Sequence, residues 1–243
     1  MKRTKIGRNV LILFGGGLFC MALLGSCDAI TGFFSTSWGS NLERDLGRLL
    51  PKITAKNAAD LANDTAGDPK RAKLVAEKIL EALKNTTDPA EKAALLNAGL
   101  IAANNASNLI TVMMRNIDAF SNSTGNVETV LEKVQAAGDV TANADIISGL
   151  LTASGADTDS TLLAGASQDN LALAAITLLL ADAQEQDYET AADQKDYLDE
   201  FEAKKGDASQ LTDKQKGAIV LGVAAGKKDG VLKDVLDDLK LTG

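Results

Sequence analysis

The chain has 243 residues, a formal net charge of −8 and a sequence pI near 4.7, with no histidine and two cysteines. Without histidine it has no Ser-His-Asp triad, no Cys-His pair and no imidazole metal site. The acidic balance argues against nucleic-acid binding, which needs a basic surface. Alanine and leucine supply 38 and 34 residues, and both are strong helix formers, so the composition favours a folded helical protein.

The first 27 residues have the layout of a secretory signal peptide. Four basic residues lie among the first eight, and an uncharged, largely apolar stretch follows from residue 9 to residue 27. That stretch ends in Leu24-Gly25-Ser26-Cys27, which is an aliphatic residue and two small residues before a cysteine. The order of these three features predicts export from the cytoplasm and processing near Cys27.

Leu24-Gly25-Ser26-Cys27 resembles the lipobox of bacterial lipoproteins. The resemblance implies cleavage between Ser26 and Cys27, with residues 1–26 removed as a signal peptide. Cys27 then becomes the acylated first residue of the mature protein, since its thiol is the nucleophile available to take a lipid. An uncleaved membrane helix is the alternative, because about 19 uncharged residues just span a bilayer. Gly15-Gly16-Gly17 weakens that stretch as a spanning helix.

Lipoprotein maturation changes the charge and the thiol content of the chain. Residues 27–243 carry 21 Lys and Arg against 33 Asp and Glu, a formal charge of −12. Cys20 leaves with the signal peptide and Cys27 is acylated, so no free thiol and no disulfide remain. We expect a membrane-anchored protein that faces the periplasm or the cell surface. In enteric-type sorting, Asp28 after the cysteine favours the inner membrane.

Residues 27–40 are interpreted as a tether. It contains Phe33, Phe34 and Trp38, three of the seven aromatic residues that remain after cleavage. These rings either dock the tether onto the folded body or lie at the bilayer interface, where aromatic side chains are favoured.

Residues 41–243 are expected to form one all-helical domain. Helix start signals recur along it: Asp68-Pro69 and Asp88-Pro89 each place an N-cap before a proline, and Thr212 with Gln215 matches a capping box. Ser107 is a further candidate N-cap. The apolar spacing between these starts is helical, and the predicted helices are 40–50, 53–64, 69–84, 89–105, 107–119, 127–137, 140–152, 169–185, 189–204, 213–226 and 230–240.

The predicted fold class is all-α, with about eleven short antiparallel helices in one bundle or a short helical-repeat array. Three segments are apolar nearly all round and are predicted to be core: 95–103, 171–181 and 218–225. They begin alike after polar residues, at intervals compatible with a repeat of helix pairs. The body resembles tetratricopeptide-type proteins only loosely, in its paired amphipathic helices.

Four polar clusters are candidate sites, and each has a plainer structural interpretation that we prefer. The stretch 182–202 carries nine acidic residues, as either a cation site or a solvated helix face. Asp157-Thr158-Asp159-Ser160 resembles the start of a calcium loop but lacks its later glycine and glutamate, so it is interpreted as a capping turn. The third is the segment Met113-Met114-Arg115, which is interpreted as core with local charge pairing. The fourth is an asparagine cluster, which is interpreted as the end of one helix and the start of the next and consists of Asn97, Asn104, Asn105 and Asn108.

The expected function is a non-catalytic, lipid-anchored scaffold that binds another envelope protein, with Cys27 and its acyl chains as the membrane contact. No phosphate-binding glycine loop is found in the sequence, and no pair of carboxylates stands out, so we expect no enzymatic activity, no cofactor and no metal. The alternative is a carrier of a small or hydrophobic ligand, with a cavity of roughly 300 Å³ among helices 89–119 and 169–185.

Overall fold

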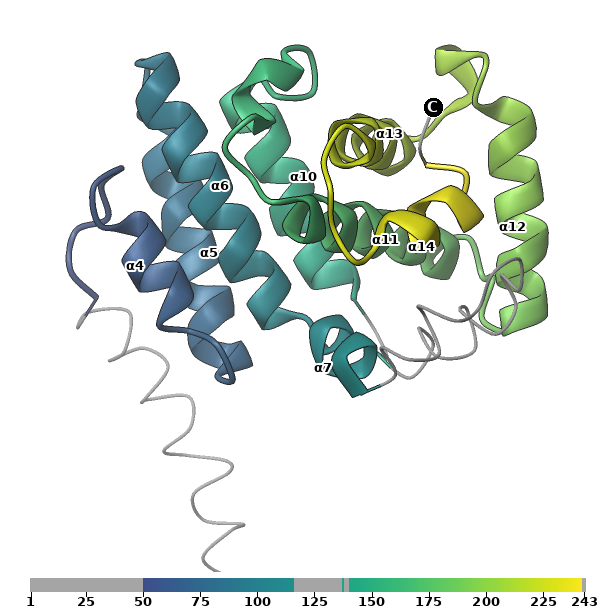
Figure 1. The fold of residues 1–243 in the computed structure, drawn as a ribbon, viewed down its shortest axis with the longest axis horizontal. Helices are drawn as coiled ribbons and strands as arrows, with labels where there is room; N and C mark the ends of the chain where they lie inside the picture. Colours follow the sequence, from purple (N-terminus) through teal and green to yellow (C-terminus); the bar gives the residue numbers. More distant parts are fainter. Residues whose placement is uncertain (1–49, 116–136, 138–139, 242–243) are drawn as a thin grey trace, which may run out of the picture. The chain divides into compact units, whose positions relative to one another are not determined.

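The computed structural model describes residues 50–115, 137 and 140–241, and Lys52–Gly243 form one compact unit. Within these described residues every regular element is helical and none is a strand, which confirms the predicted all-α class (Figure 1). Predicted helices 40–50 and 127–137 lie outside the described residues except for residues 50 and 137, as do the last four residues of predicted helix 107–119. The described elements are α4 (Ala58–Asn63), α5 (Pro69–Lys84), α6 (Pro89–Ala106), α7 (Asn108–Arg115), α10 (Thr141–Ser154), η2 (Ser160–Leu163), α11 (Gln168–Glu185), α12 (Ala191–Lys204), η3 (Ala208–Gln210), α13 (Asp213–Gly226) and α14 (Lys233–Asp238).

Side-chain caps start α5, α6 and α13 where the sequence places them. Asp68 and Asp88 accept hydrogen bonds from the backbone N–H groups of Arg71 and Glu91 at the starts of α5 and α6. Thr212 and Gln215 form both bonds of the predicted capping box at α13. These bonds satisfy backbone donors that have no partner inside the helix.

Three helices end on a residue in the left-handed conformation. The residues are Gly155 after α10, Asp187 after α11 and Lys240 after α14. After α11, the Tyr188 N–H bonds the Ala183 carbonyl and the Asp187 N–H bonds the Gln184 carbonyl, which is the Schellman arrangement. The left-handed residue changes the direction of the chain and ends the helix at that point.

The three segments predicted to be core are buried, and they lie in α6, α11 and α13. In α11, thirteen of eighteen residues are buried, so neighbours cover it on most sides. It packs against α10, α13, α6 and α14, and α12 lies along its C-terminal part (Figure 1). No helix among the described residues is long and apolar enough to cross a membrane.

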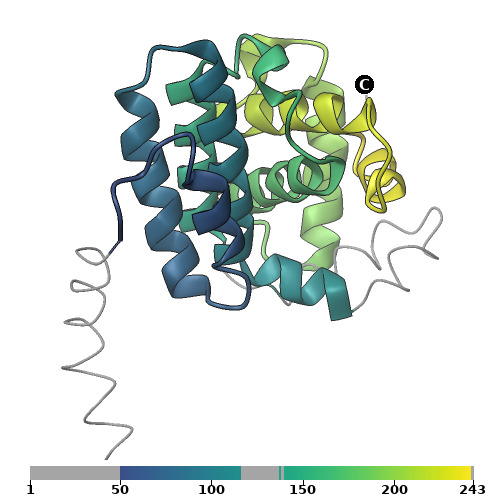
Figure 2. The same ribbon diagram turned by 60° about the vertical axis from the view of Figure 1, so that its left-hand side comes forward.

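At one end of the unit, α4, α5 and α6 lie side by side (Figures 1 and 2), and α12 lies at the other end (Figure 1). The helix α10 contacts α5 and α6 on one side and α11 and α13 on the other. Because α10 and α11 contact each other, they join the two groups of helices into one core.

Small residues allow the close crossings between these helices. A Cβ on Gly99 of α6 would lie 2.6 Å from Leu150 Cδ2 of α10 and 3.2 Å from Ile79 Cγ2 of α5. A Cβ on Gly222 of α13 would lie 2.7 Å from Leu241 Cβ and 2.8 Å from the Leu241 carbonyl oxygen. At Gly222 the neighbour is backbone, which cannot rotate away as a side-chain tip can.

We predict that Gly222→Ala destabilises the protein by about 1–3 kcal/mol, because the new methyl group overpacks against the Leu241 backbone. Alanine is the better helix former by about 1 kcal/mol, so propensity alone predicts the opposite sign. Gly206→Ala is the matched control, since nothing lies within 4 Å of its added Cβ and its φ is not left-handed. Urea denaturation measures both, and a Gly222→Ala variant as stable as Gly206→Ala contradicts the prediction.

Candidate functional site

The most densely hydrogen-bonded buried group of the described residues is the carboxyl group of Asp182, near the end of α11. Asp182 is 3% exposed. Its Oδ2 accepts hydrogen bonds from Tyr197 Oη at 2.7 Å and Gln186 Nε2 at 2.6 Å, and its Oδ1 accepts one from Thr212 Oγ1 at 2.6 Å. Gln215 Nε2 donates in turn to Tyr197 Oη at 3.3 Å. We call these five residues the Asp182 cluster.

Local structure brings the members of the Asp182 cluster together from three helices. Asp182 and Gln186 are one turn apart around the end of α11, and Tyr197 points inward from α12. Thr212 is the N-cap of α13, so its oxygen accepts the Gln215 N–H while its hydroxyl proton goes to Asp182. The capping residue predicted from sequence therefore also connects α13 to α11.

Aromatic packing and burial surround the same point. The rings of Tyr188 and Tyr197 meet edge to face with centroids 5.4 Å apart, and Tyr188 Oη donates to Glu200 at 2.9 Å. Burial, followed by the negative charge of Asp182, raises the pKa of the Tyr197 phenol well above its ordinary value of 10.0. Tyr197 is therefore a neutral donor in the folded protein.

A lysine bridges the helices beside the Asp182 cluster. Lys214 Nζ of α13 lies 2.9 Å from Glu185 Oε1 of α11 and 3.1 Å from Asp145 Oδ1 of α10. Burial lowers the pKa of Lys214, but its hydrogen bonds to Glu185 and Asp145 outweigh that effect and leave the pKa raised. The charged lysine thus links three helices through two carboxylates.

The chemistry of the Asp182 cluster favours a structural role. A carboxylate offers about four acceptor positions, and three are occupied here by donors from the protein itself. A general base needs an acceptor position within reach of substrate, and Asp182 is buried under its own donors. Over the described ranges, no group of three or more acidic or cysteine side chains is arranged to hold a metal ion.

The acidic stretch 182–202 was interpreted as a solvated face, and that prediction is wrong for Asp182. Apolar residues of α11 precede Asp182 at helical spacing, with Ala175 and Leu178 on the same side, so the helix carries it into the core. Most of the other acidic residues of the stretch are exposed, as predicted, and Tyr197, Leu198 and Phe201 form the packing side of α12. That shared helical position is the signal that identifies Asp182 as buried.

The asparagine cluster on α6 connects helices, and the predicted end and restart is confirmed. Asn104 Nδ2 donates to the Asn170 carbonyl of α11 at 2.9 Å. Asn105 Nδ2 donates to the Ala62 carbonyl at 3.1 Å and to Thr65 Oγ1 at 3.2 Å, next to α4. After α6 ends, Ser107 Oγ accepts the Leu109 N–H at the start of α7.

The remaining candidate residues divide into a confirmed turn and positions without a described side chain. Asp159 caps η2 by accepting the Thr161 N–H and hydroxyl, and these bonds lower the pKa of Asp159, as expected of a capping turn. The side chains of 113–115 lie outside the described part of the structure, as do Ser26 and Cys27, the predicted cleavage and lipid-attachment residues.

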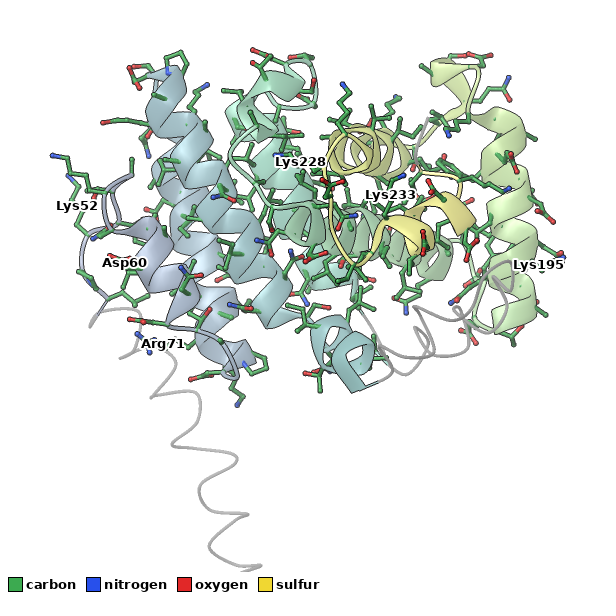
Figure 3. All side chains as sticks on the ribbon, viewed as in Figure 1. Lys52, Asp60, Arg71, Lys195, Lys228 and Lys233 are labelled. Atoms are coloured by element: carbon green, nitrogen blue, oxygen red, sulfur yellow. The ribbon has the colours of Figure 1, made fainter. Side chains whose placement is uncertain are left out.

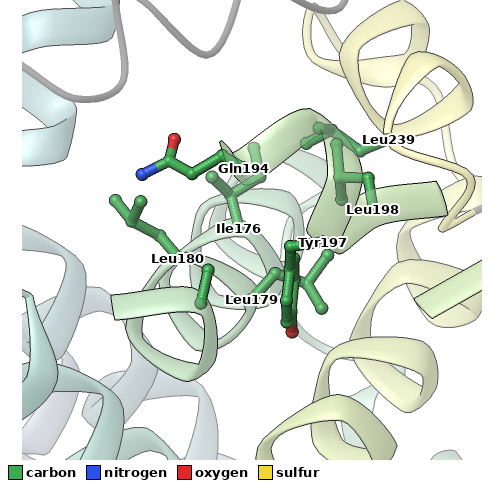
Figure 4. Close-up of a pocket in the computed structure, with 8 residues that line it drawn as sticks. Ile176, Leu179, Leu180, Gln194, Tyr197, Leu198 and Leu239 are labelled. Atoms are coloured by element: carbon green, nitrogen blue, oxygen red, sulfur yellow. The ribbon is translucent and has the colours of Figure 1, made fainter. Parts of the chain in front are cut away.

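A small apolar cavity lies between α11, α12 and α14 (Figure 4). Its volume is about 20 Å³, which is room for about one water molecule. Four of its lining residues belong to 169–185 and none belongs to 89–119, the two segments among which the carrier alternative expects a cavity of roughly 300 Å³. Its lining residues are Ile176, Leu179, Leu180, Ala183, Gln194, Tyr197, Leu198 and Leu239.

We predict that Asp182→Ala destabilises the protein by about 3 kcal/mol or more, because three buried donors lose their acceptor together. Asp199→Ala, which removes an exposed carboxylate from α12, is the control and is expected to stay within about 0.5 kcal/mol of the parent protein. Equilibrium urea denaturation measures both variants. Equal midpoints for the two would show that the hydrogen bonds of Asp182 do not stabilise the protein.

Alkaline pH offers a second test of the Asp182 cluster. The raised pKa of Tyr197 keeps its phenol neutral in the folded protein, whereas the unfolded chain ionises near pH 10. The contribution of Tyr197 to the free energy of unfolding is therefore fully present below about pH 10. It decreases as the pH rises further, by up to about 1.4 kcal/mol per pH unit. Tyr197→Phe is expected to flatten the pH dependence of unfolding above pH 10 relative to the parent, and an unchanged slope contradicts it.

No protein-family model, curated protein or solved structure matches the chain, so the functional conclusion depends on its own residues and geometry.

Proposed function

We propose that the chain is a non-catalytic lipoprotein of the bacterial envelope, anchored through acylated Cys27, whose helical body presents a surface to another envelope protein. The observation that carries the proposal is the sequence Leu24-Gly25-Ser26-Cys27 after a basic start and an apolar stretch. Several acyl chains give a stable membrane anchor, whereas a single chain gives marginal binding.

The described body supports an interaction role over a catalytic one. Two of its buried polar side chains, Asp182 and Asn104, form hydrogen bonds that hold helices together. Its exposed surface is mostly charged helix, and its one large exposed apolar side chain among the described residues is Val231. A surface of this kind is recognised through shape and charge.

We also propose that α6, α11 and α13 are the equivalent second helices of a degenerate helical repeat, preceded in the chain by α5, α10 and α12. The second helix of each pair starts on an oxygen cap, from Asp88, Ser167 and Thr212 respectively. Each of these second helices is also apolar on nearly all sides. Stacked pairs cover one another's apolar faces, which accounts for one continuous core.

Radiolabelling of the two cysteine variants tests the anchor. Cys27→Ala is expected to abolish incorporation of radiolabelled palmitate in a bacterial host and to leave a larger, unprocessed precursor. Cys20→Ala is the matched control, and we expect normal labelling and processing from it because Cys20 lies in the discarded segment. Labelling of Cys27→Ala at the parent level would overturn the proposed function.

A further inference from the structure

Charge is distributed unevenly along the described residues. Over 52–115 there are nine Lys and Arg against seven Asp and Glu, a net charge of +2. Over 140–241 there are nine Lys against nineteen Asp and Glu, a net charge of −10. The acidic character of the protein therefore comes from its later helices, and the earlier ones are slightly basic.

The difference is sharpest between two helices. Helix α5 contains five basic and two acidic residues, for a net charge of +3. Helix α12 contains two lysines and five acidic residues, for a net charge of −3. Figure 1 shows α5 and α12 at opposite ends of the described helices, with α6, α10 and α11 between them, and Figure 3 shows Arg71 of α5 and Lys195 of α12 at these two ends.

The basic side chains of α5 face outward. Ala72, Val75, Ala76, Ile79 and Leu83 of α5 are buried, and α5 packs on α6 and α10. The side chains on the opposite side of the helix are exposed, and they are Lys70, Lys73, Glu77, Lys78, Glu81 and Lys84. This outward side of α5, which we call the basic face, has a net positive charge within a chain whose mature charge is −12.

From these charges we infer that the basic face of α5 docks against anionic lipid headgroups and that the acidic α12 end points away from the membrane. The inference rests on the proposed lipid anchor, which holds the body near a bilayer. The chain passes from Cys27 to Lys52 in 25 residues, and such a tether is at most about 90 Å long. The anchor holds the body near the bilayer without specifying which end faces it, and the charge difference between the two ends favours one orientation.

The orientation arises because an anionic bilayer attracts the basic α5 end of the body and repels the acidic α12 end. Each lysine or arginine near an anionic bilayer favours the bound orientation by about fivefold, and the effect fades within a Debye length. An anionic surface therefore favours α5 and disfavours α12. The docked orientation leaves the α12 end of the unit available to a protein partner.

Fluorescence energy transfer to labelled lipid headgroups tests the orientation. Full-length protein carrying Glu77→Cys or Glu202→Cys is acylated in a bacterial host, and the new thiol takes a donor dye. These positions lie on exposed sides of α5 and α12, and both changes remove one negative charge. The purified protein is added to neutral phosphatidylcholine vesicles, or to vesicles with about one third phosphatidylglycerol, and measured in low and high salt.

We expect energy transfer from position 77 to exceed that from position 202 by at least twofold in anionic vesicles at low salt. The two values are expected to converge in neutral vesicles and at about 0.5 M salt, where charges are screened. Equal transfer from both positions in anionic vesicles at low salt, or the same difference in neutral vesicles, would overturn the orientation.

Matched charge reversals identify the surface responsible. Lys73→Glu with Lys84→Glu is expected to abolish the difference, because it reverses two exposed cations of the basic face. Lys216→Glu with Lys227→Glu makes the same change in net charge at exposed positions in α13 and at its C-cap, and is expected to preserve the difference. An equal loss in both double variants would overturn the role of α5. Failure of the unmutated chain to associate with either vesicle would overturn the lipid anchor and the orientation with it.

Discussion

Burial of α11 on most of its sides is the constraint on which the rest of the described structure depends. A helix with a single apolar face needs one neighbour, whereas α11 needs covering by α10, α13, α6 and α14 together. The chain has few aromatic residues, so alanine and leucine must supply most of the covering surface. Small side chains fill the core only when helix axes approach closely, which explains the tight contact at Gly99 between α6 and α10.

Apolar contacts between alanine and leucine side chains are compatible with several arrangements of the helices. Hydrogen bonds and ion pairs between helices favour one of these arrangements. Asn104 and Asn105 are adjacent residues of α6 that bond two different neighbours, α11 and the end of α4. Asp182 does the same for α12 and α13, and Lys214 for α10 and α11. Asp182 and Asn104 are buried, so a rearranged packing would leave their hydrogen-bonding groups without partners, and this favours one arrangement of otherwise similar helices.

The sequence was sufficient to predict most of the described helices, because their signals are local. Asp-Pro pairs and the Thr212 capping box mark starts, and nearly continuous apolar runs mark α6, α11 and α13 as core. The first turns of the segment predicted at 53–64 are irregular, and α4 begins only at Ala58. The short turns η2 and η3 were missed, since a single Asp-capped turn has no periodicity to detect.

The candidate site was less predictable than the fold. Composition placed Asp182 in an acidic stretch, although its partners Tyr197 and Thr212 are 15 and 30 residues further along the chain. Such partners are found only when three helices are packed together. The helical spacing of Asp182 with Ala175 and Leu178 is enough to mark this carboxylate as buried, but its partners on α12 and α13 are identified only in the packed core.

The edge-to-face pair of Tyr188 and Tyr197 has an optical consequence. Both rings lie where α12 meets the body, beside the buried Phe201, and their fixed mutual geometry makes them a source of near-ultraviolet circular dichroism. Far-ultraviolet dichroism measures helix content of the whole chain. Comparing the two signals during unfolding therefore distinguishes detachment of α12 from unfolding of the entire core, without any introduced label.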